Sequence, residues 1–294
     1  MRIIIVSAAD AAFLPPLSEM LSSIEAGVKR EGISVGILDL GLSRANIERL
    51  SRYGATIVSP GWDYSLNHFA IPANDGFKAM TARPHLPQHF PGYDLYVWLD
   101  ADCWVQDWNS VLTLIGAGKN SQFAIIPEEH PGYAPHSEWK NARPDAWMLY
   151  YKNVRTCFGA NAARDLLQRV TLNSGVFSAT ADAPHWSAWS RHLGAALKQL
   201  DHAFYYVEQL AIANAIFADN LAVELLPAKH NWACHRRLPL IAEDERRFIE
   251  PTPPYDDLGI IHLVGAVKHQ KEFELRDLRG TIHVSTLRHS PLTA

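Results

Sequence analysis

The chain has 294 residues, of which 48% are hydrophobic and 20% are charged. This composition excludes a disordered protein and allows one large core or two small ones. The formal net charge of −4 at pH 7 gives no overall attraction for a polyanion, so we expect no nucleic-acid partner.

The first 60 residues predict the order strand, helix, strand, helix, strand. β-branched apolar runs predict the strands, at residues 2–6, 33–40 and 55–60. Helical apolar spacing, a capping serine and closing glycines predict the helices, at residues 15–32 and 43–54. Alternation at this spacing indicates a mainly parallel sheet covered on both faces, with ligands at the carboxyl ends of its strands.

The middle of the chain continues this alternation. Strands are predicted at residues 93–100, 123–128 and 171–180, and helices in part of 78–90 and at 110–118, 184–200 and 207–218. Between them, residues 128–147 hold too many prolines and polar side chains for a core element. Long irregular segments of this kind are usually binding loops or lids.

The remaining segments have weaker patterns. Residues 153–170 are mixed in character, residues 223–228 and 260–269 have strand-like portions, and the tail is more polar. No repeat, low-complexity segment or linker divides the chain. We therefore expect one continuous domain over residues 1–294.

The sequence also indicates where the protein works. The opening apolar run is too short for a signal-peptide core, and no stretch approaches the roughly 20 apolar residues of a membrane-spanning helix. The three cysteines are widely separated and lack the paired spacing of a structural zinc site. We expect a cytoplasmic protein, with peripheral contact at the inner membrane face as an option and an oligomeric state that the sequence leaves open.

Two aspartates, Asp100 and Asp102, follow the apolar run LYVWL. Carboxylates on alternate residues at a strand end can turn towards one divalent cation once the backbone bends, and such a cation can neutralise phosphate. An ordinary strand ending is an alternative, because aspartate is a common turn former. A phosphatase-type nucleophile loop of the haloacid-dehalogenase kind is a third, which Trp104 disfavours because it occupies the place of a threonine or valine.

A second motif, IIHLVGAVK, holds His262, Gly265 and Lys268 at intervals of three. A histidine at a strand end can supply a nitrogen ligand, which suits Mn²⁺ better than Mg²⁺. Glycine lets the backbone approach an anion, and lysine adds positive charge for phosphate. By itself the motif is more commonly a strand, a turn glycine and a solvated lysine, and only its combination with Asp100 and Asp102 favours a site.

Several ordered segments together resemble glycosyltransferase family 8, which includes bacterial lipopolysaccharide galactosyl- and glucosyltransferases and glycogenin. They are SAADAAFLPPLSEMLSSI, ILDLGLSRANIERL, the segment from Arg83 to Asp102, LNSGVF, YYVEQLAIAN, LPAKHNW and HLVGAVK. The resemblance implies an α/β GT-A fold, a single Rossmann-like domain with a mainly parallel central sheet flanked by helices. Residues 1–105 would bind the nucleotide, and residues 106–294 would form the acceptor side.

The resemblance also implies a role for each matching residue. The implied metal ligands are Asp100, Asp102 and His262, for Mn²⁺ with Mg²⁺ as an alternative. The implied nucleotide and diphosphate contacts are Ala8, Asp10, Phe13, Gly265 and Lys268. The implied neighbours of the transferred sugar are Arg83, Asn173, Glu208 and Gln209, with Glu208 standing where the family has aspartate.

The reaction implied is transfer of a hexose, with retention of configuration, from UDP-glucose or UDP-galactose to a saccharide, lipid-linked or other hydroxyl acceptor. Preorganised positive charge would stabilise the leaving diphosphate. Retention would require an ion pair or a covalent adduct with the protein, and the sequence leaves both open. We expect the acceptor at residues 128–151, whose candidate side chains are His130, Tyr133, His136, Trp139, Trp147 and Tyr150.

Two other functions remain as alternatives. A catalytically silent protein on the same scaffold could bind a nucleotide sugar or carbohydrate. A nucleotidyltransferase should have a glycine-rich basic loop after its first strand, where this chain has SAADAAF, without glycine or lysine. That place in the sequence therefore disfavours the nucleotidyltransferase.

Overall fold

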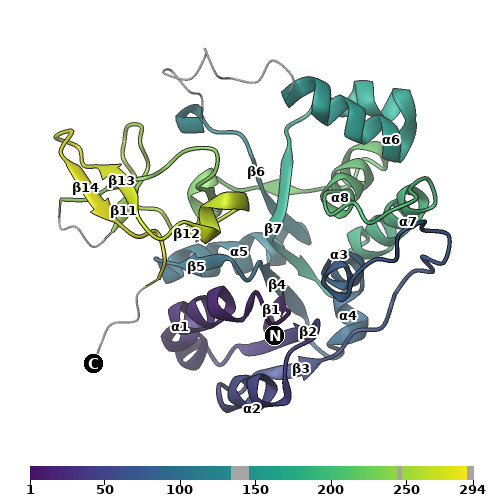
Figure 1. Ribbon diagram of the computed structural model, residues 1–294, viewed down its shortest axis with the longest axis horizontal. Coiled ribbons are helices and arrows are strands. Elements are labelled where there is room, and N and C mark those ends of the chain that lie inside the picture. The colour runs from purple at the N-terminus through teal and green to yellow at the C-terminus, as the bar shows by residue number, and fades with distance from the viewer. Residues whose placement is uncertain (134–145, 244–246, 290–294) are drawn as a thin grey trace.

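The computed structural model describes residues 1–133, 146–243 and 247–289 (Figure 1). Its centre is a seven-stranded sheet with the strand order β3-β2-β1-β4-β7-β6-β8. These strands are β1 (Ile3–Ala9), β2 (Ser34–Asp39), β3 (Thr56–Val58), β4 (Leu95–Leu99), β6 (Phe123–Pro127), β7 (Leu172–Thr180) and β8 (Glu224–Leu225). Four neighbouring pairs are parallel, and the two pairs that β7 forms are antiparallel. The expected α/β architecture with a mainly parallel sheet is confirmed.

Helices cover both faces of this sheet (Figure 1). On one face lie α1 (Leu14–Glu31), α2 (Arg44–Arg52) and α5 (Trp108–Ser121). On the other lie α3 (Lys78–Ala82), α4 (Leu86–His89), α6 (Ala146–Leu166), α7 (His185–Leu197) and α8 (Val207–Ala218). Along β4, Leu95 and Val97 pack into the first of these cores, and Tyr96 and Trp98 pack into the second. All five residues of β4 are buried, whichever face of the sheet they lie on, which explains its unbroken apolar sequence.

Local sequence signals fix the ends of the helices. Helix α1 has prolines in its first turn and ends at Gly32, whose φ of 65° is left-handed. Helix α2 begins after Ser43, whose hydroxyl accepts a hydrogen bond from the Asn46 amide at 3.3 Å. Helix α5 begins after Asp107, which caps the helix through the Asn109 amide at 3.0 Å. The predicted helices in these places are confirmed to within a few residues.

A small sheet extends the main one at the carboxyl end of β4. It consists of β5 (Cys103–Val105), β12 (Ile260–His262) and β9 (Trp232–Ala233). Strand β12 runs antiparallel to β5, so that His262 lies opposite Cys103, and parallel to β9, so that His262 lies opposite Ala233. This pairing brings the distant motif at 260–269 to the residue that follows Asp102.

The C-terminal part has its own core around Trp104, Trp232 and Phe273. It contains two antiparallel pairs, β10 (Leu240–Ile241) with β11 (Phe248–Ile249) and β13 (Phe273–Arg276) with β14 (Ile282–Ser285). In Figure 1 these strands form the yellow-green region beside β5 and β12. None of these strands is predicted from the sequence, because all four are too short to show periodicity.

The segment 153–170 is more regular than predicted. Most of it belongs to α6, which is interrupted at Gly159, where φ is 85°. The break divides the apolar pattern between two helical pieces, which explains the mixed pattern in the sequence. No helix in the described residues is both long enough and apolar enough to span a membrane.

Candidate functional site

Asp100, Asp102 and His262 lie together at the carboxyl end of β4. His262 Nε2 is 3.3 Å from Asp102 Oδ1 and 3.7 Å from Asp100 Oδ2. The three side chains offer ligand atoms that all lie within 4.8 Å of one another, and they form the one such group of three found in the described part of the chain. The main chain supports the cluster, because the Leu263 amide donates to the Asp102 carbonyl at 2.9 Å.

The other oxygens of the two aspartates are already engaged. Asp100 Oδ1 accepts hydrogen bonds from the guanidinium of Arg83 and from Trp98 Nε1. Asp102 Oδ2 pairs with Lys268 Nζ at 3.1 Å. The remaining oxygens, Oδ2 of Asp100 and Oδ1 of Asp102, therefore face the imidazole. Two carboxylates and one imidazole suit a divalent cation such as Mn²⁺ or Mg²⁺, with Mn²⁺ favoured by the nitrogen ligand.

The charges within the cluster reinforce one another. Burial raises the pKa of the Asp102 carboxyl, but the hydrogen bonds and charges of His262 and Lys268 outweigh it and lower that pKa to about 2. Asp102 is thus an anion at neutral pH, which is the form that binds a cation.

A buried ion pair lies beside the cluster. The Arg83 guanidinium bridges Asp100 and Glu208, and its charge also lies 4.7 Å from the centre of the Trp98 ring. Arg83 and Glu208 are 5% and 1% exposed, and Ser174 Oγ donates to Glu208 Oε2 at 2.9 Å. Glu208 Oε1 is buried without a hydrogen-bond partner among the described residues, an uncommon state for a buried polar atom.

Glu208 has an unusual acid–base environment. Burial raises the pKa of its carboxyl to about 7, although the charge of Arg83 and the Ser174 hydroxyl act in the opposite direction. A carboxyl group with this pKa can hold or release a proton near neutral pH.

Gln209 follows Glu208 in the first turn of α8. Its Oε1 accepts from the Ser174 main-chain N–H at 3.2 Å. Asn173, which precedes Ser174 on β7, accepts hydrogen bonds from the Gly175 amide and from Asn231, both at 2.9 Å. Its amide nitrogen donates to Glu128 at 2.6 Å. Asn173 thus lies in the site, but its hydrogen-bonding groups hold protein partners.

The predicted nucleotide contacts lie at the ends of β1 and β12. Asp10 Oδ1 accepts from the amides of Ala12 and Phe13 at 2.9 and 3.0 Å, which fixes the turn after β1. Lys268 Nζ lies 4.5 Å from the centre of the Phe13 ring, which joins the two predicted contact groups. Gly265 begins a 3₁₀ turn, η5 (Gly265–His269), with a φ of 68°. Ala8 lies in β1, opposite Leu38 of β2.

Three polar residues of the site had no predicted role. Ser174 lies in the motif LNSGVF, Asn231 lies in LPAKHNW, and Glu128 ends a predicted strand. The side chain of Glu128 is 7% exposed and pairs with Arg236. Asn231 is 2% exposed, and its Oδ1 lies 2.8 Å from His262 Nδ1. A polar residue that is buried beside a candidate ligand can be recognised as part of a site. Burial at these three positions depends on contacts with distant parts of the chain, so the sequence does not reveal it.

The segment predicted to meet the acceptor is described only in part. His130 and Tyr133 pack against Trp232, with ring centres 5.4 and 4.7 Å from its own. Tyr150 packs against the core of the α6–α8 face. His136 and Trp139 lie outside the described residues, as does the side chain of Trp147. His130, Tyr133 and Tyr150 thus each contact other side chains of the protein.

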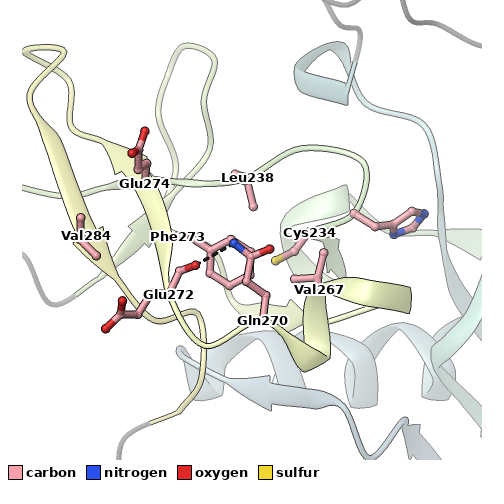
Figure 2. Close-up of a pocket in the computed structure, with 9 residues that line it drawn as sticks. Cys234, Leu238, Val267, Gln270, Glu272, Phe273, Glu274 and Val284 are labelled. Atoms are coloured by element: carbon pink, nitrogen blue, oxygen red, sulfur yellow. Dashed lines mark hydrogen bonds between the residues drawn. The ribbon is translucent and has the colours of Figure 1, made fainter.

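A cavity of about 670 Å³ lies on the far side of η5 (Figure 2). It is lined by residues from the loop after β9, from η5 and the segment that follows it, and from the β13–β14 hairpin: Cys234, His235, Leu238, Val267, Gln270, Glu272, Phe273, Glu274 and Val284. The Gln270 amide lies near its middle and donates to the Glu272 carbonyl at 2.7 Å. Because Val267 precedes Lys268, a molecule in this cavity would contact the turn that positions the lysine.

Comparison with known proteins defines the fold class. No protein-family model and no curated protein matches the sequence. Among solved structures, however, the chain shares the GT-A fold of glycosyltransferases, with the candidate cluster at the carboxyl end of β4.

Three of these structures have TM-scores above one half. The galactosyltransferase LgtC, in complex with donor and acceptor sugar analogues, has a TM-score of 0.53 and 15% identity, covering 89% of this chain and 87% of that one. An active-site mutant of LgtC has a TM-score of 0.51 and 17% identity, with the same coverage. The bifunctional glycosyltransferase WbbM has a TM-score of 0.51 and 13% identity, and covers 90% of this chain but only 46% of its own. At these identities the likeness establishes the fold.

Proposed function

We propose that this protein is a metal-dependent, retaining glycosyltransferase that moves a hexose from a nucleotide sugar, UDP-glucose or UDP-galactose, to a hydroxyl acceptor. The observation that carries the proposal is the meeting of Asp100, Asp102 and His262 beside Lys268, at the carboxyl end of a central strand. A site with these groups can hold a cation and a diphosphate side by side. The resemblance to family 8 and the structural likeness to LgtC support the same function.

The residues around the cluster fit the two ends of such a donor. Lys268 lies between Asp102 and the Phe13 ring, where it can contact a phosphate while Phe13 contacts the base. Arg83 and Glu208 lie on the other side of Asp100, towards α8. We assign the transferred sugar to that side, next to the buried pair of Arg83 and Glu208.

Cleavage of the donor leaves negative charge on the diphosphate and positive charge on the sugar ring. A bound Mn²⁺ or Mg²⁺ would supply a Lewis acid for the diphosphate. Lys268 would add fixed positive charge there without reorganisation. Glu208, with Gln209 next to it, would lie near the cationic ring, and either a short-lived ion pair or a covalent adduct would give retention.

A panel of nucleotide sugars with Mn²⁺, assayed for hydrolysis and for transfer, tests this function. We expect turnover with at least one hexose donor, and a fall of about 100-fold or more in Asp102→Asn, because the variant loses a charged ligand at the site of developing charge. Asp256→Asn is the matched control, since Asp256 also pairs with a lysine, Lys229 at 2.6 Å, away from the cluster. Its activity should equal that of the wild type.

Two results would contradict the proposal. Absence of both turnover and specific donor binding across the panel would show that the protein is not a glycosyltransferase acting on these donors. Tight donor binding without turnover would instead favour the silent binding protein, which is the alternative that shares this scaffold.

A further inference from the structure

A chain of hydrogen bonds leads from the main chain of β7 to the ring of His262. The Gly175 amide donates to Asn173 Oδ1 at 2.9 Å, and the same oxygen lies 2.9 Å from Asn231 Nδ2. Asn231 Oδ1 lies 2.8 Å from His262 Nδ1. Asn173, Asn231 and His262 are 5%, 2% and 2% exposed, so water does not compete for these bonds.

The direction of each bond follows from its neighbour. A main-chain N–H can only donate, so the Asn173 atom that faces Gly175 is the carbonyl oxygen. The other Asn173 atom is then the NH₂ group, which faces the acceptor Glu128 at 2.6 Å. Because Asn173 presents an oxygen to Asn231, Asn231 must present its NH₂ group there and its oxygen to His262. The last bond therefore needs a proton on His262 Nδ1. This order does not depend on how the amide atoms were assigned.

We propose that Asn231 is a positioning residue that keeps a proton on His262 Nδ1, so that Nε2 is the nitrogen left to bind a cation between Asp100 and Asp102. The neutral ring otherwise has two tautomers, and only this one offers a lone pair to a cation between the two carboxylates. Partners on the far nitrogen of a ligand histidine fix both its tautomer and its orientation. The inference rests on the proposed function only in assigning a cation to the site.

Manganese affinity, measured for the metal-free protein by electron paramagnetic resonance of free Mn²⁺, tests the role of Asn231. Asn231→Leu should bind Mn²⁺ about 10- to 100-fold more weakly, which is the usual effect of losing such a partner. Asn214→Leu is the matched control, because Asn214 is also buried and bonds the Nδ1 atom of His192, at 2.9 Å, outside the site. It should bind Mn²⁺ like the wild type.

The ¹⁵N chemical shifts of the His262 ring report which nitrogen carries the proton. They would not change if Asn231 only filled space. In ¹⁵N-histidine protein with the diamagnetic cation Mg²⁺ bound in place of a proton on Nε2, the signal absent from His262→Gln identifies His262. Its shifts should show Nδ1 protonated in the wild type and in Asn231→Asp, which keeps an oxygen for that proton. In Asn231→Leu, Nε2 should carry a larger share of the proton.

The outcomes separate the inference from the proposed function. Wild-type protein with the proton on Nε2, or Asn231→Leu with unchanged manganese affinity and unchanged ring shifts, would overturn the inference. Protonated Nδ1 in a wild-type protein that does not bind Mn²⁺ would support the tautomer assignment while contradicting the metal-dependent function. If Asn231→Leu does not fold, Asn231→Asp decides, since it should retain the Nδ1–H ring and bind Mn²⁺ more tightly than His262→Gln does.

Discussion

Gly175 packs directly against two of the candidate metal ligands. Its carbonyl accepts from the Asp100 amide at 2.8 Å, and its own amide holds Asn173. A Cβ atom at this position would lie 2.4 Å from His262 Cε1 and 2.7 Å from Asp100 Oδ2. The strand is buried in the central sheet, so the backbone cannot move away to make room. The close approach of two ligands therefore requires glycine.

Gly175→Ala should separate the ligands without removing any of them. We expect Mn²⁺ affinity to fall by about 10-fold or more, and the free energy of unfolding to fall by about 1–3 kcal/mol, because an added methyl group forces tightly packed side chains apart. Manganese titration and urea unfolding measure the two effects. Gly116→Ala in α5 is the control, since its Cβ would meet nothing within 4 Å and alanine favours a helix.

Unchanged manganese affinity in Gly175→Ala, with the control also unchanged, would contradict this account. It would mean that the cluster tolerates a displaced His262 and that the observed spacing of the three ligands is not required.

At the scale of elements, the predictable parts of the fold are those with strong local patterns. The alternation of β1, α1, β2 and α2 was predictable because each of these elements is long enough to show its period. The direction of β7 was not, because a strand buried on both faces has the same apolar sequence whether it runs parallel or antiparallel. Strands β5, β9 and β12 have only two or three residues each, which is too short for a period.

The candidate site was predictable to a similar degree. Asp100, Asp102, His262 and Lys268 were recognised by residue type and motif, and the structure places them together. The roles of Asn231 and Glu128 were not, because each depends on a partner far along the chain, 31 and 45 residues away. Residue type indicates which chemistry is available, whereas such supporting contacts become visible only once the chain is folded.

The turn η5 allows a prediction about an element. It begins at Gly265 with a left-handed φ of 68°, and three residues later Lys268 reaches Asp102 and the Phe13 ring. The methyl group added in Gly265→Ala would have no atom within 4 Å. Its effect therefore comes only from placing alanine at a left-handed φ, which costs about 1–2 kcal/mol of conformational free energy. Because the glycine is exposed, the turn can relieve that cost by shifting, which would move Lys268.

We expect Gly265→Ala to bind UDP with Mn²⁺ about 5- to 30-fold more weakly by titration calorimetry, the equivalent of that cost. Gly280→Ala is the matched control, because Gly280 has a φ of 83° and open space around it, in the turn between β13 and β14. Equal losses of UDP affinity in both variants, or no loss in either, would show that the geometry of η5 does not position Lys268 for the donor.

At the scale of the whole molecule, the cores hold histidines that the folded state keeps neutral. His185 is 1% exposed and stacks on Phe123, with ring centres 4.5 Å apart. Burial lowers the pKa of His185 to about 4, against a smaller opposite effect of the backbone at Ala222. Burial likewise lowers the pKa of His230 to about 4. Both groups therefore couple the stability of the fold to pH.

The sign of this coupling follows from proton uptake. Between about pH 6.5 and pH 4 the unfolded chain binds a proton at each of these histidines and the folded chain does not, so the free energy of unfolding falls as the pH falls. For a pKa lowered from 6.5 to about 4, the full loss is about 3 kcal/mol for one histidine. Carboxylates that are paired in the folded state add their own losses at lower pH.

His185→Phe isolates one of these contributions. Phenylalanine keeps an aromatic ring against Phe123 but cannot take up a proton, so the decline in stability between pH 7 and pH 5 should be smaller than in the wild type, by about 1–2 kcal/mol. Urea unfolding of metal-free protein across this range measures it. His202→Asn, at an exposed histidine paired with Asp201, should keep the wild-type slope. The same slope in His185→Phe as in the wild type would mean that the folded protein accepts a proton on His185, and that burial against Phe123 does not exclude the charge.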